Sequence, residues 1–251
     1  MGRKPTIIVV INRNLLNLGI LILSLFFGWW LYHEPVIRTN LPLSPTISGK
    51  KIVIDAGHGG IDPGAKSDRG LLEKDINLDI ALKLKRHLAM AGVSCVMIRE
   101  TDQDFSNSNK DFTTKKRRDL SYRTRVANQS GAELYLSIHA NSFSQSIYEG
   151  AQTFHEKSDS NSKYLAEAIQ NQLVKRLKPN RRQAKVGDYR VLNDTKMPGV
   201  MIEVGFLSNP TEAKLLEDEN YREKIAKAIF RGVVDYFRED RSCPSKEIET
   251  Q

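Results

Sequence analysis

Three side chains of the sequence combine the chemistry of metal ligands with positions at the ends of expected structural elements. His58 lies in a Gly-His-Gly-Gly turn that follows an apolar strand pattern, and His139 ends a second apolar run, residues 134–139. Glu73 stands where a helical pattern begins. Two imidazoles and one carboxylate from separate segments are a donor set typical of catalytic Zn²⁺, which leaves a fourth position for water. Either histidine alone could be a polar residue that closes a strand, but two in such settings favour a zinc site.

A fourth residue, Glu203, places a carboxylate in the middle of the apolar run at residues 200–204. Burial disfavours the ionised form and raises the pKa of a carboxyl group. A carboxylate that titrates near neutrality can take a proton from water and hand it to a leaving amine, so Glu203 is a candidate catalytic base. The alternative is a structural ion pair with Arg123 or Arg125. The loop that follows at residues 205–210 favours the catalytic interpretation.

The rest of the sequence alternates between strand and helix patterns, which indicates an α/β fold. Strand patterns lie at residues 51–56, 93–98, 134–138, 150–154, 189–192 and 200–204. Helical patterns lie at residues 72–91, 119–131 and 163–177, in a short helix capped by Thr211, and in a final helix that ends at Phe237. We expect a single domain over residues 50–238, with a mostly parallel central sheet flanked by helices. Its metal donors should meet at one edge of the sheet, where α/β folds place their sites.

One polar stretch, residues 101–118, separates the second strand pattern from the helix that follows. It ends in Lys115-Lys-Arg-Arg118 and shows no apolar periodicity. We therefore expect a mobile basic loop, followed by a short helix that Asp119 caps and that ends near Gly131.

The first fifty residues differ from the domain. Residues 1–14 carry basic side chains and precede residues 15–32, an apolar run with aromatic rings at its far end. Its length is just sufficient to span a bilayer, and the charge order predicts a cytoplasmic N-terminus and a domain outside the cytoplasm. A cleaved signal peptide would release the protein, but no small-residue cleavage site follows, which favours an uncleaved transmembrane anchor. A proline-containing linker at residues 33–49 and a polar tail at residues 239–251 complete the predicted organisation.

Charge and cysteine content restrict the class of protein. The formal net charge is +8, which fits an anionic partner. No RNA-reading aromatic motif or recognition-helix signature is present, so we expect no nucleic-acid partner. Cys95 lies in an apolar strand pattern and Cys243 in the polar tail, so the two cysteines predict neither a disulfide scaffold nor a metal cluster.

At its candidate site residues the chain resembles the zinc-dependent N-acetylmuramoyl-L-alanine amidases, the amidase-3 family. The resemblance covers residue 51 to about residue 237. Four motifs carry it: Asp-Ala-Gly-His-Gly-Gly at 55–60, Leu-Glu-Lys-Asp at 72–75, Ser-Ile-His-Ala-Asn at 137–141 and Ile-Glu-Val-Gly-Phe-Leu-Ser-Asn at 202–209. Ala56 stands where proline is commoner, which should not affect coordination. The resemblance implies zinc ligands at His58, Glu73 and His139, a catalytic Glu203, and a substrate-orienting Asn141.

The resemblance also implies a reaction and a setting. The reaction is the zinc-dependent hydrolysis of the amide between N-acetylmuramic acid and L-alanine in peptidoglycan. The single N-terminal apolar segment and the basic stretch before residue 120 look most like the spore-cortex branch, which implies a role in muramic-δ-lactam formation and germination. An activating protein partner is a further expectation for that branch.

Two other functions are compatible with the same residues. One is a membrane-tethered peptidoglycan-binding module without catalysis, against which the complete donor set and Glu203 argue. The other is a zinc-dependent peptidoglycan deacetylase, whose usual metal site uses an aspartate with histidines at a spacing that this sequence lacks.

Overall fold

The computed structural model describes residues 14, 17, 22–26, 46–106, 111–177 and 179–238. The chain divides into two compact units, Met1–Leu41 and Pro42–Gln251. In the first unit the described residues are helical and exposed. None of the helices in the described part of the chain combines the length and the apolar character that a bilayer span requires. The predicted anchor at 15–32, linker at 33–49 and tail at 239–251 lie largely or wholly outside the described residues.

The second unit is built on a six-stranded sheet in the order β2-β1-β3-β6-β4-β5. The strands are β1 Lys51–Ala56, β2 Ser94–Met97, β3 Leu134–Asn141, β4 Gln152–His155, β5 Lys185–Val186 and β6 Gly199–Phe206. β1 pairs in parallel with β2 and β3, and β3 pairs in parallel with β6, whereas β4 runs antiparallel to β6. The prediction of an α/β domain with a mostly parallel sheet is confirmed. Because β1, β3 and β6 are parallel, the segments that carry the candidate site leave the sheet at the same edge.

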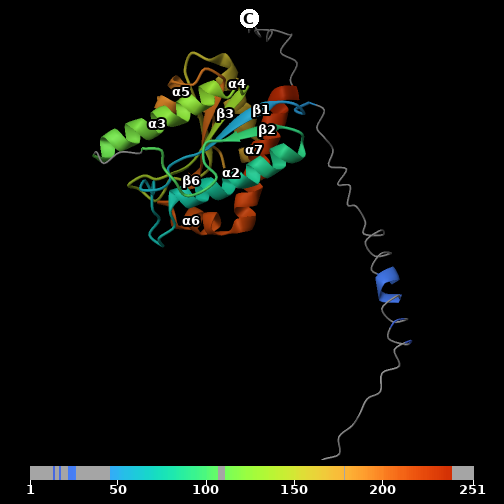
Figure 1. The fold of residues 1–251 in the computed structure, drawn as a ribbon. Coiled ribbons are helices and arrows are strands. Elements are labelled where there is room, and N and C mark those ends of the chain that lie inside the picture. Colours follow the sequence, from blue (N-terminus) through green and yellow to red (C-terminus); the bar gives the residue numbers. More distant parts are fainter. Residues whose placement is uncertain are drawn as a thin grey trace, which may run out of the picture. The chain divides into compact units, whose positions relative to one another are not determined.

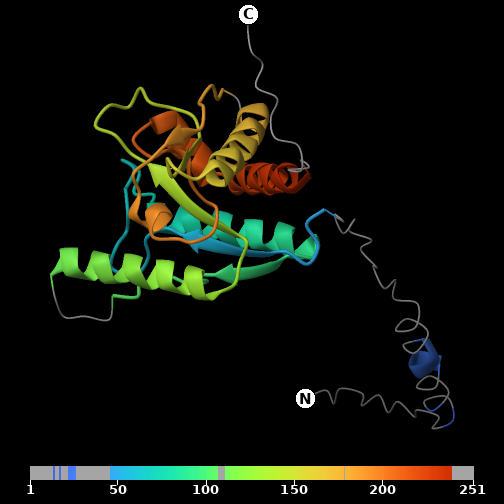
Figure 2. The ribbon, with the colours of Figure 1, turned by 90° about the horizontal axis from the view of Figure 1, so that it is seen from above.

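Helices cover both faces of this sheet (Figures 1 and 2). Their bounds are α2 Glu73–Met90, α3 Phe112–Gln129, α4 Ser160–Arg176, α5 Arg190–Asn193, α6 Pro210–Glu217 and α7 Glu219–Arg238. α2, α4 and α7 share the larger hydrophobic core with one face of the sheet, while α3 and α5 cover the other face. Side chains along β1 alternate between the two faces of the sheet. Ile52 and Ile54 belong to the larger core, and Val53 belongs to the core on the opposite face.

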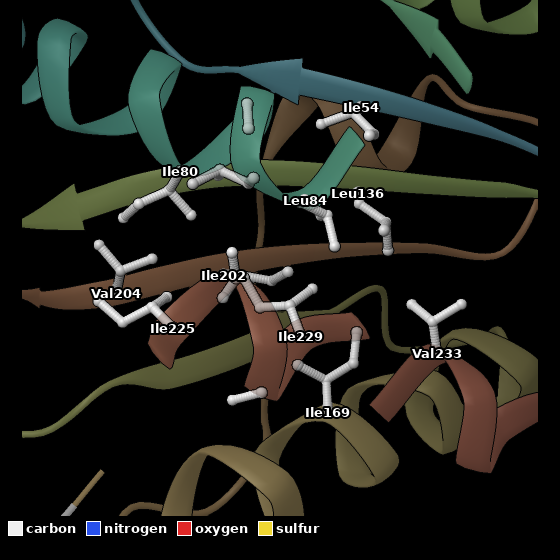
Figure 3. Close-up of a cluster of buried hydrophobic side chains, with 14 of the residues drawn as sticks. Ile54, Ile80, Leu84, Leu136, Ile169, Ile202, Val204, Ile225, Ile229 and Val233 are labelled. Atoms are coloured by element: carbon white, nitrogen blue, oxygen red, sulfur yellow. The ribbon is translucent and has the colours of Figure 1, made fainter. Parts of the chain in front are cut away.

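The larger core explains the period-four pattern of α2. Ile76, Ile80, Leu84 and Leu88 are all buried, and Figure 3 shows Ile80 and Leu84 facing apolar side chains of the central strands. Burying one such side chain stabilises the fold by roughly 1.5–3 kcal/mol. α4 and α7 approach each other closely because Gly232 has no side chain, since a Cβ there would lie 2.4 Å from the Cα of Ile169.

The predicted mobile basic loop at 101–118 is wrong at its basic end, because residues 112–118 belong to α3, whereas residues 101–106 do lie outside helices and strands. The helix begins at Phe112, and its N-cap is Asp111, whose side chain accepts a hydrogen bond from Thr114 N. Lysine and arginine are good helix formers, so the charged run at 115–118 extends the helix rather than preventing it. Asp119 lies within the helix and accepts a hydrogen bond from Phe105 N instead of capping.

Two shorter predictions also need correction. Residues 189–192 do not form a strand; α5 begins at Arg190 and buries Val191 and Leu192. Four residues are too few for periodicity to separate a strand from one helical turn. Helix α6 is capped by Asn209 rather than Thr211. The Asn209 side chain accepts hydrogen bonds from the backbone amides of Thr211 and Glu212, in the first turn of α6.

Candidate active site

The three predicted metal donors converge at the carboxyl edge of the parallel strands. His58 lies in the turn after β1, Glu73 is the first residue of α2, and His139 lies in β3. Glu73 Oε1 is 3.1 Å from His58 Nε2 and 2.9 Å from His139 Nδ1, and all three donor atoms lie within 4.8 Å of one another. Ligand atoms around a tetrahedral zinc ion stand about 3.3 Å apart. The cluster therefore has the donor types and the spacing that could hold a metal ion.

Contacts with the surrounding chain orient Glu73 and His58 towards the centre of the cluster. Glu73 Oε2 accepts from Ala65 N at 2.8 Å, and Oε1 accepts from Ala140 N at 3.1 Å. Asp62 Oδ2 lies 2.8 Å from Nδ1 of His58, on the side of the ring opposite Glu73. A carboxylate behind a ligating histidine fixes the ring and raises its basicity, as in many metal centres.

The electrostatics of the donors also suit a cation. Burial alone would raise the pKa of Glu73, but the imidazoles of His139 and His58 hold that pKa well below its ordinary value. Burial alone would lower the pKa of His58, but Asp62 and Glu73 raise it to about 9. The negative charge of the cluster therefore lies on the carboxylates of Glu73 and Asp62, beside the imidazole rings, and a cation would displace the proton from His58 on binding.

The turn that presents His58 has an unusual backbone. Among the described residues, His58 is the only one other than glycine with a positive φ, at 60°. Such a conformation costs about 1–3 kcal/mol and persists only where the surroundings impose it. Two buried guanidinium groups impose it here. Arg123 Nη2 donates to His58 O at 2.8 Å, and Arg99 donates to Ala56 O at 2.8 Å and to Gly57 O at 2.9 Å.

A buried carboxylate neutralises the guanidinium group of Arg123. Asp55 Oδ1 accepts from Arg123 Nη1 at 2.5 Å, and Asp55 Oδ2 accepts from the hydroxyl of Tyr135 at 2.5 Å. Asp119 accepts from Arg123 Nε at 2.5 Å. The sequence analysis did not predict that Arg99, Arg123 and Asp55 form the buried network that holds the His58 turn. The available signal was Asp55 itself, an acidic residue at the end of an apolar strand, which requires a buried partner.

Two glycines leave the space that the donors occupy. A Cβ on Gly57 would lie 2.2 Å from Cε1 of His139, and one on Gly64 would lie 2.5 Å from Oε2 of Glu73. Real atoms do not approach this closely, so any side chain at either position would displace a donor.

Glu203 lies in β6 directly opposite His139 in β3. It is 8% exposed, and its Oε2 has no hydrogen-bond partner. The predicted alternative, an ion pair with Arg123 or Arg125, is wrong, because Arg123 pairs with Asp55 and Asp119 and Arg125 lies over the ring of Tyr122. Burial, with a smaller contribution from the Glu73 charge, raises the pKa of Glu203 to about 7. A carboxyl group with these properties can exchange protons at neutral pH.

The two histidine donors and Glu203 face one cleft of about 240 Å³. His58, His139 and Glu203 line it together with apolar side chains from both flanks, Leu120 and Met201 among them. A buried acid–base group beside a cluster that could bind a metal is an arrangement suited to hydrolysis.

The family model for N-acetylmuramoyl-L-alanine amidases, amidase-3, matches residues 52–235. The chain belongs to this family. It is therefore an N-acetylmuramoyl-L-alanine amidase, an enzyme that acts on peptidoglycan, and the resemblance inferred from the motifs is confirmed.

Individual relatives agree with this assignment. The amidase is 39% identical over 230 residues to the germination-specific N-acetylmuramoyl-L-alanine amidase of Bacillus subtilis (strain 168). The aligned region covers 90% of this chain and 95% of the relative. It is similar to the structure of the CwlD amidase from Clostridioides difficile in complex with the GerS lipoprotein, with a TM-score of 0.72 and 44% identity over 74% of this chain and 98% of that one. An N-acetylmuramoyl-L-alanine amidase from Clostridium difficile 630 matches with a TM-score of 0.67 and 32% identity over 74% of this chain and 96% of that chain.

The structure places the remaining candidate of the amidase, Asn141, away from the lining of the cleft. Its side chain accepts a hydrogen bond from Ser142 N at 2.8 Å and so shapes the turn after β3. Tyr189 and Arg190 do line the cleft, and the sequence pattern did not single them out. These two residues reach the cleft because α5 packs beside α3, which is a contact between segments far apart in the chain.

Proposed function

We propose that His58, Glu73 and His139 bind a zinc ion in this amidase and that Glu203 is its catalytic base. The observation that carries the proposal is the position of Glu73 Oε1, which is about equally far from two imidazole nitrogens, at 3.1 and 2.9 Å, within one cluster of donor atoms. When bound, zinc would supply a Lewis acid for the lactyl carbonyl of N-acetylmuramic acid and lower the pKa of water to about 7.

The protein's own residues account for the proton transfers. Glu203, with a pKa of about 7, takes a proton from the attacking water. It then delivers that proton to the nitrogen of the departing L-alanine, which breaks the amide and releases the stem peptide. The buried guanidinium groups of Arg99 and Arg123 keep the His58 turn in place throughout, since they bond its carbonyl oxygens rather than the substrate.

One relative supports a role in germination. The Bacillus subtilis relative is described as germination-specific, and it aligns with 90% of this chain. We therefore propose that this amidase acts on cortex peptidoglycan, where removal of the stem peptide precedes muramic-δ-lactam formation by a separate deacetylase. An N-terminal anchor at residues 15–32 would hold the domain outside the cytoplasm, and residues 1–14 would face the cytoplasm.

A protein partner is a further part of the proposal. The similar Clostridioides difficile CwlD amidase was solved in complex with the GerS lipoprotein. A lipoprotein of this kind would be held at the same membrane surface as an anchored amidase, so an activating partner fits the proposed location.

The test combines metal analysis with product analysis. Purified protein is treated with a chelator, reloaded with zinc and incubated with peptidoglycan, and the products are identified by mass. Zinc-dependent release of free stem peptides is expected. Loss of acetyl groups without peptide release would instead support a deacetylase, and equal activity with and without zinc would contradict the metal assignment.

Matched histidine variants test the ligands directly. His139→Ala should remove stoichiometric zinc and activity. His155→Ala is the control, because His155 is also buried at a strand end, where its Nδ1 contacts Glu156 O, and it lies outside the cluster. Equal zinc content in the two variants would contradict the assignment.

A further inference from the structure

A basic groove of about 370 Å³ borders helix α3. Four of its lining side chains are arginines, Arg117, Arg118, Arg125 and Arg190, and none of its lining residues is acidic. The aromatic ring of Tyr122 also lines it. That ring stacks on Phe105 and lies beneath the guanidinium group of Arg125, so the groove offers guanidinium groups to a ligand, without a built-in counter-charge.

The charges of the groove are available to a ligand. All four arginines are exposed. In the described part of the chain no carboxylate lies within 4.0 Å of the guanidinium nitrogens of Arg117, Arg118 or Arg125. Arg190 Nη2 donates to Ser121 Oγ at 2.9 Å, and its Nε pairs with the carboxylate of Asp194 at 3.1 Å, where both side chains are over 40% exposed. An exposed pair of this kind is weak and exchanges partners easily.

The groove and the catalytic cleft share their boundary. Arg190 lines both, and α3 supplies Lys116, Asp119 and other residues to the cleft and Arg117 and Arg125 to the groove. α3 and α5 lie side by side on this face of the sheet (Figure 1). Because a helix with its side chains is about 10 Å across, a ligand group in the groove would lie about three extended residues from the cleft.

We propose that this groove binds a carboxylate of the peptidoglycan substrate and so selects which amides reach Glu203. The inference rests on the peptidoglycan amidase activity. A polymeric substrate whose scissile amide occupies a cleft of about 240 Å³ must extend beyond it. The planar fork of arginine matches a carboxylate through two parallel hydrogen bonds.

Two parts of the substrate can supply that carboxylate. One is the C-terminal carboxylate of the stem peptide. The other is the lactyl carboxylate that hydrolysis leaves on a neighbouring muramic acid of the same glycan strand. The chemistry of recognition is the same in both cases, so the experiment has to distinguish the sources.

The test uses two pairs of synthetic substrates. The first pair is a disaccharide with its stem peptide, ending either in a free carboxylate or in a carboxamide. The second pair is a tetrasaccharide whose second lactyl group is either a free carboxylate or a methylamide. We compare kcat/KM for the wild type, for Arg117→Gln/Arg125→Gln, and for the control Arg176→Gln/Arg231→Gln, which removes the same charge from exposed positions on α4 and α7.

The wild type and the control should prefer the free carboxylate of one pair by roughly threefold to tenfold, as expected for one or two exposed ion pairs. The groove variant should lose that preference while keeping its melting temperature and its rate on the neutral substrate. A preference within the first pair identifies the stem peptide as the source, and one within the second identifies the glycan strand.

The inference is overturned if the wild type shows no preference in either pair, or if the groove variant keeps the preference. A wild type that cleaves none of the substrates would contradict the amidase reaction itself, and the inference with it. The two failures are therefore distinguishable.

Discussion

Helix α3 separates two regions that hold their arginines in opposite ways. On the side of the cleft, Arg123 is 2% exposed and bonded to Asp55, Asp119 and the carbonyl of His58. On the side of the groove, Arg117 and Arg125 are exposed and have no carboxylate within 4.0 Å in the described part of the chain. A neutralised, buried charge can only position its neighbours, whereas an exposed and unpaired one can recognise a ligand. The same residue type on one helix therefore serves two purposes, which burial decides.

The cleft contains a second contrast, between two glutamates. Imidazoles surround Glu73 and hold its pKa below the ordinary value, whereas burial raises the pKa of Glu203 to about 7. The first is an anion at every physiological pH and suits a metal ligand. The second gains and loses a proton near neutrality and suits a base.

The largest effect is expected from removing the titrating glutamate. Glu203→Gln keeps the shape of the side chain and should lower turnover by about 10²- to 10⁴-fold, because a general base contributes that much. Zinc content should be unchanged. Amidase rate and zinc stoichiometry, measured on one preparation, check both statements.

The metal-free form of the same variant tests burial separately. A carboxyl group with a raised folded pKa destabilises the fold once the pH exceeds its unfolded value, and the cost is complete above the folded pKa of about 7. Glu203→Gln should therefore raise the melting temperature at pH 8 and leave it unchanged at pH 4. Near wild-type turnover in a folded, zinc-loaded variant would exclude Glu203 as the base.

Breaking the buried arginine network should be the next largest effect. Arg123→Gln leaves Asp55 buried without its cation, which typically costs about 3–5 kcal/mol of stability. Metal affinity should fall as well, since the His58 turn loses a hydrogen bond that holds its positive φ. Urea unfolding and zinc titration measure the two losses.

Arg125→Gln is the control for that substitution. It removes the same charge from an exposed position of the same helix and should change stability by less than about 0.5 kcal/mol. Similar losses in the two variants would show that net charge, rather than the buried network, is responsible.

A smaller effect is expected from pH. The base must be ionised, so turnover should rise with pH and reach half of its maximum at or below about pH 7, since a bound cation favours the ionised form. Below that midpoint the rate should fall about tenfold per pH unit. A pH–rate profile of kcat measures the midpoint, and Glu203→Gln should lose that limb of the profile.

The smallest effect concerns salt. Exposed ion pairs weaken when the Debye length falls from about 10 Å at 0.1 M salt to about 3 Å at 1 M. Raising the salt concentration should therefore raise KM for carboxylate-bearing substrate by a few-fold in the wild type and by less in Arg117→Gln/Arg125→Gln. An equal salt response in the two proteins would mean that the groove does not contact the substrate.

The sequence by itself determined the fold class and which residues could form the site. Apolar runs of strand length that alternate with period-four helices indicate a parallel α/β sheet, and the donors His58 and His139 lie at strand ends within recognisable motifs. Parallel strands bring such ends to one edge, so the meeting of these donors with Glu73 was predictable. The position of Glu203 inside an apolar run likewise predicted a buried carboxylate.

Only the tertiary structure decided how the charges pair. Asp55 and Arg123 are 68 positions apart, and nothing local shows that this arginine bonds Asp55 rather than Glu203. The groove also depends on the packing of α5 against α3, and two of its arginines, Arg117 and Arg118, stand on the first part of α3, which the sequence pattern predicted as a loop. Helix propensity and hydrophobic periodicity are local properties, whereas the partner of a buried charge is selected by the three-dimensional packing of remote segments, which no local pattern encodes.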